Sequence, residues 1–186
     1  MAFAKKDVFV VCCDVTLGLK DEQYRVRILR CPESGVIAEE RWETPAGRLH
    51  RLEGPALLER DRKTGKVLGS YHCVHGLPHR SDGAPSTEEF DEVTGTCVYR
   101  AYRVEGVFSR PDDLPHAEWI DPSSGVVYRA EYYASLEIAS KPLLHRESGP
   151  ALVTFDRETG EQTGYAYYKH GQAYSYQNEV GLLDPK

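Results

Sequence analysis

Short, mostly apolar or alternating runs fill much of the chain, and glycine, proline, aspartate, serine and threonine separate one run from the next. Across residues 24–29 apolar side chains alternate with arginine, which is the period-two pattern of a half-buried strand. Residues 36–42 are predicted to return beside them. Four five-residue runs, three of which contain β-branched or aromatic residues, predict further strands: residues 56–60, 86–90, 116–120 and 151–155. The pattern contains no convincing amphipathic helix, and only residues 134–140 leave room for a short one.

These predicted strands recur at a nearly fixed interval. The prolines that precede them are 30, 30 and 35 residues apart: Pro55, Pro85, Pro115 and Pro150. Six residues after each proline stands an aspartate, and four residues later a glycine: Gly65, Gly95, Gly125 and Gly160. A degenerate upstream copy places Gly35 30 residues before Gly65. A fixed period of this length indicates a tandem repeat array.

Each repeat unit predicts one β-hairpin. Its Asp-x-x-Thr-Gly segment is a turn signal, because the side-chain oxygens bond nearby backbone N–H groups and glycine tolerates positive φ. The strand after the glycine ends near an aromatic residue: Trp42, Tyr71, Tyr102, Tyr132 or Tyr167. A second turn, Gly-x-x-His-Arg-x-x-Gly-Pro, links each hairpin to the next, and its proline opens a strand without donating a hydrogen bond.

The predicted fold is therefore all-β, an antiparallel meander of about five tandem hairpins that forms a curved or twisted sheet. No Pro- or Ser-rich linker divides the chain, so residues 1–186 are predicted to be one domain. Within it, residues 1–46 hold an N-terminal strand and the degenerate hairpin, residues 47–171 the repeats, and residues 172–186 a C-terminal cap.

Two segments of the repeat resemble a known family. His50-Arg51-x-x-Gly54-Pro55-Ala56 and its counterpart from His145 to Ala151 are similar to the variant MORN-type repeats of bacterial and phage proteins. The resemblance covers roughly residues 31–171, and some such proteins are antitoxin components. It implies a hairpin-repeat scaffold with an inhibitory or immunity-like role. The third copy departs from the pattern, with Ser109 in place of the histidine and residues 113–115 in place of Gly-Pro-Ala.

Charge and cysteine usage restrict the partner and the compartment. The formal net charge is −6, which disfavours nucleic acid and anionic lipid and favours a basic protein partner or simple solubility. The five cysteines are odd in number, irregularly spaced and without a Cys-x-x-Cys pair, which favours a reducing, cytoplasmic compartment. The mean hydropathy is −0.52. No apolar run is long enough for a membrane span, and the N-terminal run is too short for a signal peptide.

Three sets of repeated residues invite a chemical interpretation, and each has a simpler structural one. Equivalent histidines of neighbouring hairpins should lie roughly 9–10 Å apart, too far to share one metal. We expect them to bond backbone in the turns, while each arginine pairs with a nearby acid (Glu53, Asp82 or Glu147). The aromatic residues at the strand ends predict a structural ladder rather than a stacking platform. The repeated aspartates are explained by their turns. No catalytic signature and no cofactor or metal motif is recognised.

The irregular third copy is where a contact site is predicted, because departures from a repeat consensus indicate a different constraint or drift. Phe108, Leu136 and Ile138 are expected at exposed turns as apolar anchors. The full set of predicted partner-binding residues is Phe108, Arg110, Asp112, Asp113, Trp119, Tyr133, Leu136, Glu137 and Ile138.

The sequence thus predicts a non-enzymatic scaffold that binds and blocks another protein, as an inhibitor, antitoxin or immunity-like protein. A small-molecule or nucleotide-binding protein or enzyme, with a pocket at the third repeat, stays open as the alternative.

Overall fold

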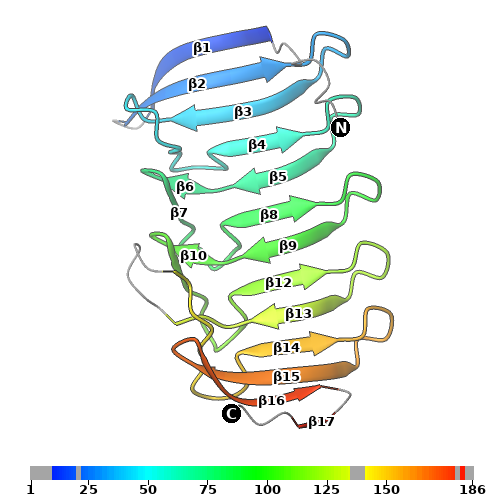
Figure 1. Ribbon diagram of the computed structural model, residues 1–186. Coiled ribbons are helices and arrows are strands. Elements are labelled where there is room, and N and C mark those ends of the chain that lie inside the picture. Colours follow the sequence, from blue (N-terminus) through cyan, green and yellow to red (C-terminus); the bar gives the residue numbers. More distant parts are fainter. Residues whose placement is uncertain (1–9, 20–21, 135–140, 179–180, 183–186) are drawn as a thin grey trace, which may run out of the picture. The chain divides into compact units, whose positions relative to one another are not determined.

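A computed structural model of the chain describes residues 10–19, 22–134, 141–178 and 181–182 (Figure 1). Its internal contacts divide the chain into two compact units, Met1–Gly76 and Leu77–Lys186, and each is treated by itself. Every regular element in the described residues is a β-strand, which confirms the all-β prediction. Within those residues there is no helix of the length and hydropathy needed to cross a membrane. The single-domain expectation stays a prediction.

In the first unit, five strands pair antiparallel in chain order. They are β1 (Val10–Leu19), β2 (Glu22–Arg30), β3 (Ile37–Glu43), β4 (Leu57–Arg60) and β5 (Val67–Tyr71), with the short β6 (Cys73–Val74) after them. The strands predicted from residues 24–29, 36–42 and 56–60 are therefore β2, β3 and β4.

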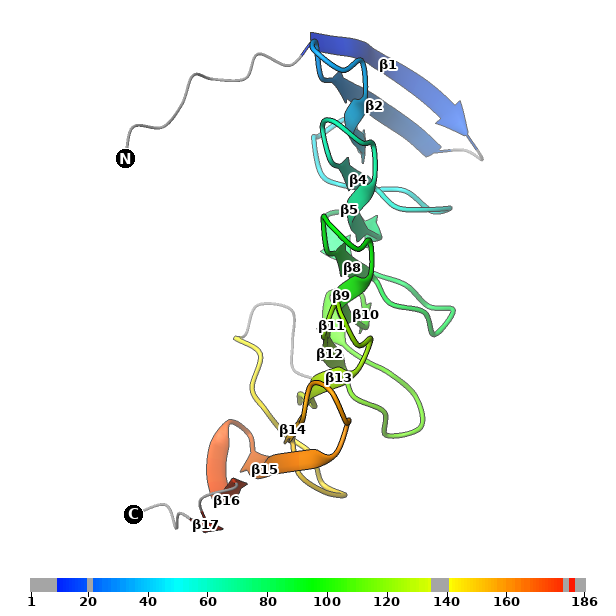
Figure 2. The ribbon, with the colours of Figure 1, turned by 90° about the vertical axis from the view of Figure 1, so that its right-hand side faces the viewer.

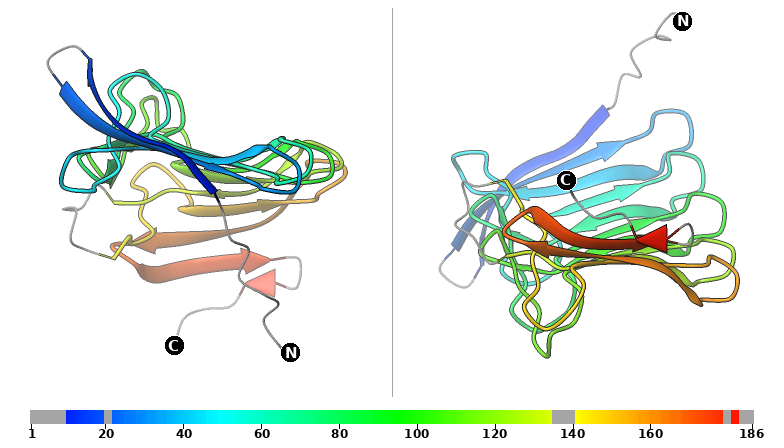
Figure 3. Two further views of the ribbon diagram at one scale, coloured as in Figure 1. Left: turned by 90° about the horizontal axis from the view of Figure 1, so that it is seen from above. Right: turned by 60° about the horizontal axis from the view of Figure 1, so that its bottom comes forward.

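The second unit continues the same hairpin pattern with eight strands in order: β8 (Thr87–Phe90), β9 (Cys97–Ala101), β12 (Ala117–Ile120), β13 (Val127–Glu131), β14 (Leu152–Phe155), β15 (Gln162–Lys169), β16 (Gln172–Asn178) and β17 (Gly181–Leu182). Three short strands lie outside this order: β7 (Leu77–Pro78), β10 (Arg103–Val104) and β11 (Val107–Phe108). β10 and β11 pair with each other. Within this unit the Asp-x-x-Thr-Gly turns lie at one end of the strands, and the linking turns lie at the other (Figures 1 and 3).

The Asp-x-x-Thr-Gly turns have the geometry expected from their residues. The five turn glycines, Gly35, Gly65, Gly95, Gly125 and Gly160, have φ between 74° and 76°. In the turn at Asp61, the carboxylate accepts hydrogen bonds from the backbone N–H of Lys63 and from the N–H and hydroxyl of Thr64. The strand register shifts by one residue beside each such turn, as in a hairpin closed by a left-handed glycine bulge.

Arginine covers the strand-end aromatic rings. The guanidinium of Arg51 lies 3.9 Å from the ring centroid of Trp42, that of Arg110 lies 3.7 Å from Tyr102, and that of Arg146 lies 3.8 Å from Tyr132. Each of these arginines also donates to the carbonyl of the proline that opens the next strand. The ladder prediction, in which the rings pack on one another, is wrong at these three positions. Figure 2 shows the loop between β11 and β12 projecting to one side of the sheet of the second unit.

Of the acids predicted to pair with the three His-Arg arginines, one is confirmed. Arg80 pairs with Asp82 at 3.0 Å, as expected. Arg51 instead lies 3.4 Å from Glu40, and Arg146 pairs with Asp113 at 2.8 Å. In both cases a carboxylate from a segment distant in sequence replaces the neighbour predicted from the chain.

A histidine in each regular linking turn holds the tip of the following hairpin. We call this arrangement the histidine clamp. At His50, Nδ1 accepts a hydrogen bond from the backbone N–H of His75 (3.2 Å), while the carbonyl of Leu49 accepts one from the N–H of Gly76 (2.7 Å). Both tip residues have positive φ, 51° and 87°, as in the two-residue hairpin turn that leaves its N–H groups pointing outward. The prediction that the repeat histidines bond backbone is confirmed.

The same clamp recurs in two further copies. His79 Nδ1 accepts from Glu105 N–H at 3.1 Å, and His145 Nδ1 accepts from His170 N–H at 3.3 Å. The preceding carbonyls, of Pro78 and Leu144, bond the glycines that follow those tips. In the third copy Ser109 replaces the histidine. There the chain carries residues 134–141 without a glycine where the other copies have an x-Gly tip. In the sequence, the missing histidine thus coincides with a missing x-Gly pair.

The core of the second unit is built from small residues and one aromatic cluster. Ala101 and Ala117 face each other across β9 and β12 and are fully buried, and Phe108 packs on them with 6% of its surface exposed. Its ring stacks on Tyr133 at 4.2 Å. The expectation that Phe108 is an exposed anchor is therefore wrong, because the short β10–β11 hairpin folds it into the core.

Candidate functional site

The residues predicted to bind a partner are distributed over different environments. Arg110 is held inside a linking turn by Tyr102, the Pro115 carbonyl and the buried Glu118, which lies 3.2 Å away. Tyr133 donates to Glu131, and its backbone N–H bonds His116 Nδ1. Burial and the Glu131 carboxylate raise the pKa of Tyr133 above its usual range. Leu136, Glu137 and Ile138 lie outside the described residues.

The two aspartates of the third linking turn both adopt positive φ, 62° at Asp112 and 52° at Asp113. Asp113 accepts hydrogen bonds from Arg146 and Ser148, and these bonds lower the pKa of its carboxyl group. Its carboxylate therefore joins two successive linking turns of the second unit. Asp113 stands where Gly83 stands in the preceding copy, and this tie offsets the strain of a left-handed non-glycine residue.

Trp119 is half-buried and lies in β12, on one face of the sheet of the second unit. In the antiparallel register it faces Tyr99 on one side and Arg129 on the other, and Tyr99 faces Glu89 across β8 and β9. Directly paired residues project from the same face of a sheet. Glu89, Tyr99, Trp119 and Arg129 therefore form one row across four strands. The rings of Tyr99 and Trp119 are 5.0 Å apart and inclined by 51°.

This aromatic pair is peculiar to the middle of the array. Two residues before the turn aspartate, where the third copy has Trp119, the other copies have Glu59, Glu89 and Thr154. Four residues after the turn glycine, where one copy has Tyr99, the others have Gly69, Arg129 and Gly164. The repeat fold does not need a large ring at either position. Two rings side by side at such positions indicate a contact surface rather than a requirement of the sheet.

The two rings line a groove of about 410 Å³ on this unit. We call it the aromatic groove. Its lining residues are Glu89, Val98, Tyr99, Trp119, Ile120, Pro122, Tyr128 and Arg157. Both rings are half-buried, and burial raises the pKa of the Tyr99 hydroxyl. A groove with aromatic walls and a few charged groups at its rim is typical of a binding site.

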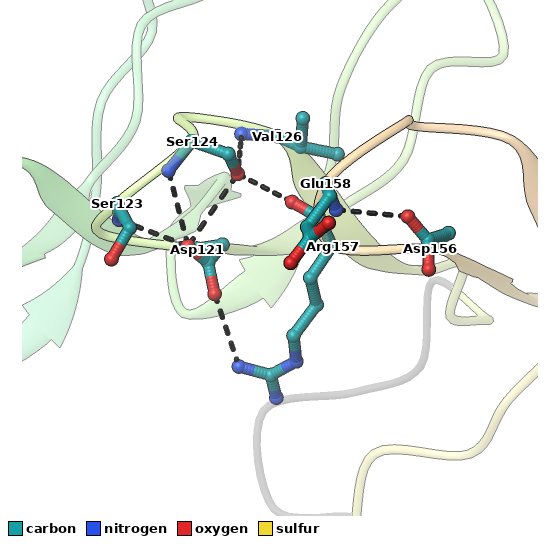
Figure 4. A network of polar contacts seen from close by, with 7 residues as sticks. All are labelled: Asp121, Ser123, Ser124, Val126, Asp156, Arg157 and Glu158. Atoms are coloured by element: carbon teal, nitrogen blue, oxygen red, sulfur yellow. Dashed lines mark hydrogen bonds and ion pairs between the residues drawn. The ribbon is translucent and has the colours of Figure 1, made fainter.

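Polar contacts tie the turn between β12 and β13 to the turn between β14 and β15 (Figure 4). Asp121 accepts hydrogen bonds from the N–H groups of Ser123 and Ser124. The Ser124 hydroxyl reaches the carbonyl of Arg157 in the next turn, and Arg157 Nη1 lies 3.4 Å from Asp121 Oδ2. The Arg157 guanidinium stacks on Tyr128 at 3.7 Å. These bonds lower the pKa of Asp121 and keep Tyr128 and Arg157 in place beside Trp119.

A second cavity of about 710 Å³ lies near the C-terminal strands and is lined by Arg146, Glu147, Lys169, His170, Gln172, Ala173 and Tyr174. Two of the cations that line it, Arg146 and Lys169, already have partners within the chain. Arg146 is bound to Asp113 and stacked on Tyr132, and Lys169 lies 3.9 Å from Glu147. We therefore favour the smaller aromatic groove, whose residues depart from the repeat pattern.

The histidines offer little for catalysis or metal binding, because Nδ1 of His50, His79 and His145 accepts a backbone N–H. Across the part of the chain that the structure describes, no group of three or more His, Cys, Asp or Glu side chains is arranged to hold a metal ion.

Sequence reasoning found Trp119 but missed Tyr99, Tyr128, Arg157 and Glu89. The signal was available: aligning the copies on the turn glycine shows Tyr99 and Trp119 as large residues at positions that hold small or polar ones elsewhere. That they are adjacent became visible only with the strand register.

Comparison of the chain with protein-family models, with curated proteins and with solved structures finds no match. The resemblance to MORN-type repeats accordingly stays a prediction.

Proposed function

We propose that the protein is a non-enzymatic repeat scaffold that binds and blocks another protein through the aromatic groove. The observation that carries this proposal is the pair Tyr99 and Trp119, which lie side by side where other copies hold glycine, threonine, arginine or glutamate. Tryptophan, tyrosine and arginine dominate the energetically important residues of protein interfaces. Trp119, Tyr99, Tyr128 and Arg157 supply all three.

The setting we propose is that of an inhibitor, antitoxin or immunity-like protein of bacterial or phage type. The resemblance of the His-Arg-x-x-Gly-Pro-Ala segments to MORN-type repeats supports it. A cytoplasmic location is part of the proposal, and the free thiols of Cys31, Cys73 and Cys97 are compatible with a reducing compartment.

The test is to capture the partner with a variant whose new residue already occurs at the equivalent position of another repeat. Trp119→Thr introduces the residue that the fourth copy holds as Thr154, so the strand is retained while the ring is lost. Val93→Thr is the control, because Val93 is 81% exposed in the β8–β9 turn and does not line the groove. The immobilised proteins are incubated with extract of the producing cells, and bound proteins are quantified by mass spectrometry.

We expect the wild type and Val93→Thr to retain one stoichiometric protein. Trp119→Thr should weaken its binding by at least about 2 kcal/mol, the usual threshold for a dominant interface residue, with the melting temperature recorded for each variant. Recovery of no stoichiometric partner, or equal capture by all three proteins, would contradict the proposal.

The alternative is a small-molecule or nucleotide-binding protein. The observation that favours it is the same groove, since Trp119, Ile120, Pro122 and Tyr128 belong to the irregular third copy and aromatic rings also stack on bases. A rise in melting temperature with a nucleotide, abolished by Trp119→Thr, would select this alternative.

A further inference from the structure

The charges lining the aromatic groove are balanced except for one. Arg157 is paired with Asp121. Arg129, at the end of the Trp119 row, is paired with the buried Glu131, and its guanidinium lies over the Trp119 ring, 5.1 Å from the centroid. Glu89 is exposed and directly faces Tyr99 across β8 and β9. Over the residues that the structure describes, its carboxylate has neither a hydrogen bond nor an ion pair. The groove therefore presents one uncompensated negative charge beside two aromatic rings.

A further cation outside the groove lining, Arg103, has no ion pair with Glu89 among the described residues. Arg103 interacts with the hydroxyl end of Tyr99, and its guanidinium lies over the Phe108 ring at 4.0 Å. It does not line the groove.

Elsewhere in the chain, an aromatic ring and a nearby carboxylate together hold an arginine. Arg110 lies between the Tyr102 ring, at 3.7 Å, and Glu118, at 3.2 Å. Arg146 lies between the Tyr132 ring and Asp113, and Arg51 lies between the Trp42 ring and Glu40. A guanidinium suits this arrangement, because its planar face stacks on a ring while its edge donates to a carboxylate. In the aromatic groove, the Tyr99 ring and the carboxylate of Glu89 offer the same combination of an aromatic ring and an acid.

We propose that the aromatic groove binds an arginine side chain of a protein partner, with its guanidinium on the Tyr99 ring, beside Trp119, and its N–H groups directed to Glu89. This inference rests on the proposed protein-binding function and specifies the chemistry of the partner at that site. It also agrees with the chain's net charge of −6, which attracts a basic surface. A lysine is a weaker candidate, because its compact ammonium cannot stack and donate along a plane at once.

The experiment uses short peptides as probes, so it does not require the partner. The probes are acetyl-Gly-Arg-Gly-amide, the same peptide with citrulline, which is neutral and nearly isosteric, and the same peptide with lysine. The chain has two tryptophans, Trp42 and Trp119, so the indole N–H signals in a nitrogen-correlated NMR spectrum are assigned with Trp42→Phe. Trp42 is an internal control, because it belongs to the first unit and does not line the groove.

We expect the arginine peptide to shift the Trp119 signal in a saturable way and leave that of Trp42 in place. It should bind at least roughly three-fold more tightly than the citrulline peptide, as an exposed cation–π contact plus an exposed ion pair would give. Glu89→Gln should remove this preference. Glu92→Gln removes the same charge from an exposed residue outside the groove and should keep it.

Several results would overturn the inference: equal binding of arginine and citrulline peptides, a preference that survives Glu89→Gln, or lysine binding as tightly as arginine. These results are separable from failure of the proposed function. If partner capture depends on Trp119 while the arginine preference is absent, the scaffold function stands and the arginine assignment falls. If the peptides behave as expected and no protein is captured, the reverse holds.

Discussion

The side chain of His50 both fills the core and accepts a backbone hydrogen bond. It is completely buried, its ring stacks on His75 at 4.2 Å and on Tyr24 at 5.4 Å, and its Nδ1 accepts the N–H of His75. Its Nε2 has no hydrogen-bond partner within the described residues, although Glu22 lies 3.5 Å away. The Nδ1 atom of a histidine in this position must carry no proton for the clamp to form.

The folding free energy should therefore depend on pH through His50. Burial and the neighbouring His75 lower the pKa of His50 below its ordinary value of 6.5, and Glu22 opposes them only in part. A lowered pKa means that the unfolded chain binds this proton more readily. The stability contributed by His50 is then complete above the unfolded pKa and is lost as the pH falls through the folded pKa.

His50→Gln keeps a side-chain carbonyl as acceptor but does not titrate. In urea unfolding between about pH 8 and about pH 5, the wild type should lose more free energy of unfolding on acidification than this variant does. His79→Gln, which alters a less buried clamp, is the comparison. Parallel pH profiles for wild type and His50→Gln would show that the clamp does not sense protons.

At the scale of the hairpin, the turn glycines set the boundaries. Gly160 has a φ of 74°, where an added Cβ would meet only a methyl group of Val126 at 3.6 Å. The cost of a side chain there comes from the backbone, not from crowding. Gly160→Val should accordingly lower the free energy of unfolding by more than about 1 kcal/mol.

The matched control is Gly18→Val. Gly18 lies in β1, has no positive φ, and an added Cβ would meet nothing within 4 Å. A β-branched residue suits a strand, so little or no loss is expected. Urea denaturation of both variants measures the difference. Equal effects of the two substitutions would mean that backbone conformation at Gly160 is not what the turn requires.

The hairpins were predictable because their signals are local. Strand positions, turn glycines and the aspartate turns follow from the repeat period, and the structure confirms them. One register error shows the limit. Tyr71 was grouped with Tyr102 and Tyr132, but it is the sixth residue after its turn glycine, whereas they are the seventh; His72 is their true counterpart. A shift of one residue moves a side chain to the other face of a sheet.

The candidate site was only partly predictable, because its contacts join distant parts of the chain. Phe108 looked exposed, since its turn position is polar-flanked in sequence, and only the folding of β10 and β11 onto Ala101 and Ala117 buries it. Arg146 is next to Glu147 in sequence but pairs with Asp113, 33 residues away. Such partners depend on which turns lie side by side, which the repeat period alone does not specify.

At the scale of the whole molecule, the open question is whether the two units unfold together. The sequence predicts one domain, since the 30-residue period between Pro55 and Pro85 runs unbroken across residues 76 and 77. Each unit contains one tryptophan, Trp42 in the first and Trp119 in the second. Single-tryptophan variants therefore report on each unit separately.

We expect Trp42→Phe and Trp119→Phe to show fluorescence transitions in urea that share a midpoint with circular dichroism of the same variant, as a single cooperative domain requires. The dichroism spectrum should be β-rich, with helix far below the roughly one-third share of ordinary globular proteins. In each variant the fluorescence reports one unit and the dichroism reports the whole chain. Midpoints that separate would assign the two units to independent domains.

The histidine clamp has one further consequence, for how such a chain can diversify. Each clamp forms its hydrogen bonds with backbone N–H groups of a hairpin tip, and the tip residues already differ: His75, Glu105 and His170. Two of these rings stack on their clamp, and a glutamate serves without stacking. The side chain at the tip can therefore vary while the backbone hydrogen bonds of the clamp stay the same. Mutations can change the tip residues one at a time and so alter the surface of the protein without altering its repeat fold.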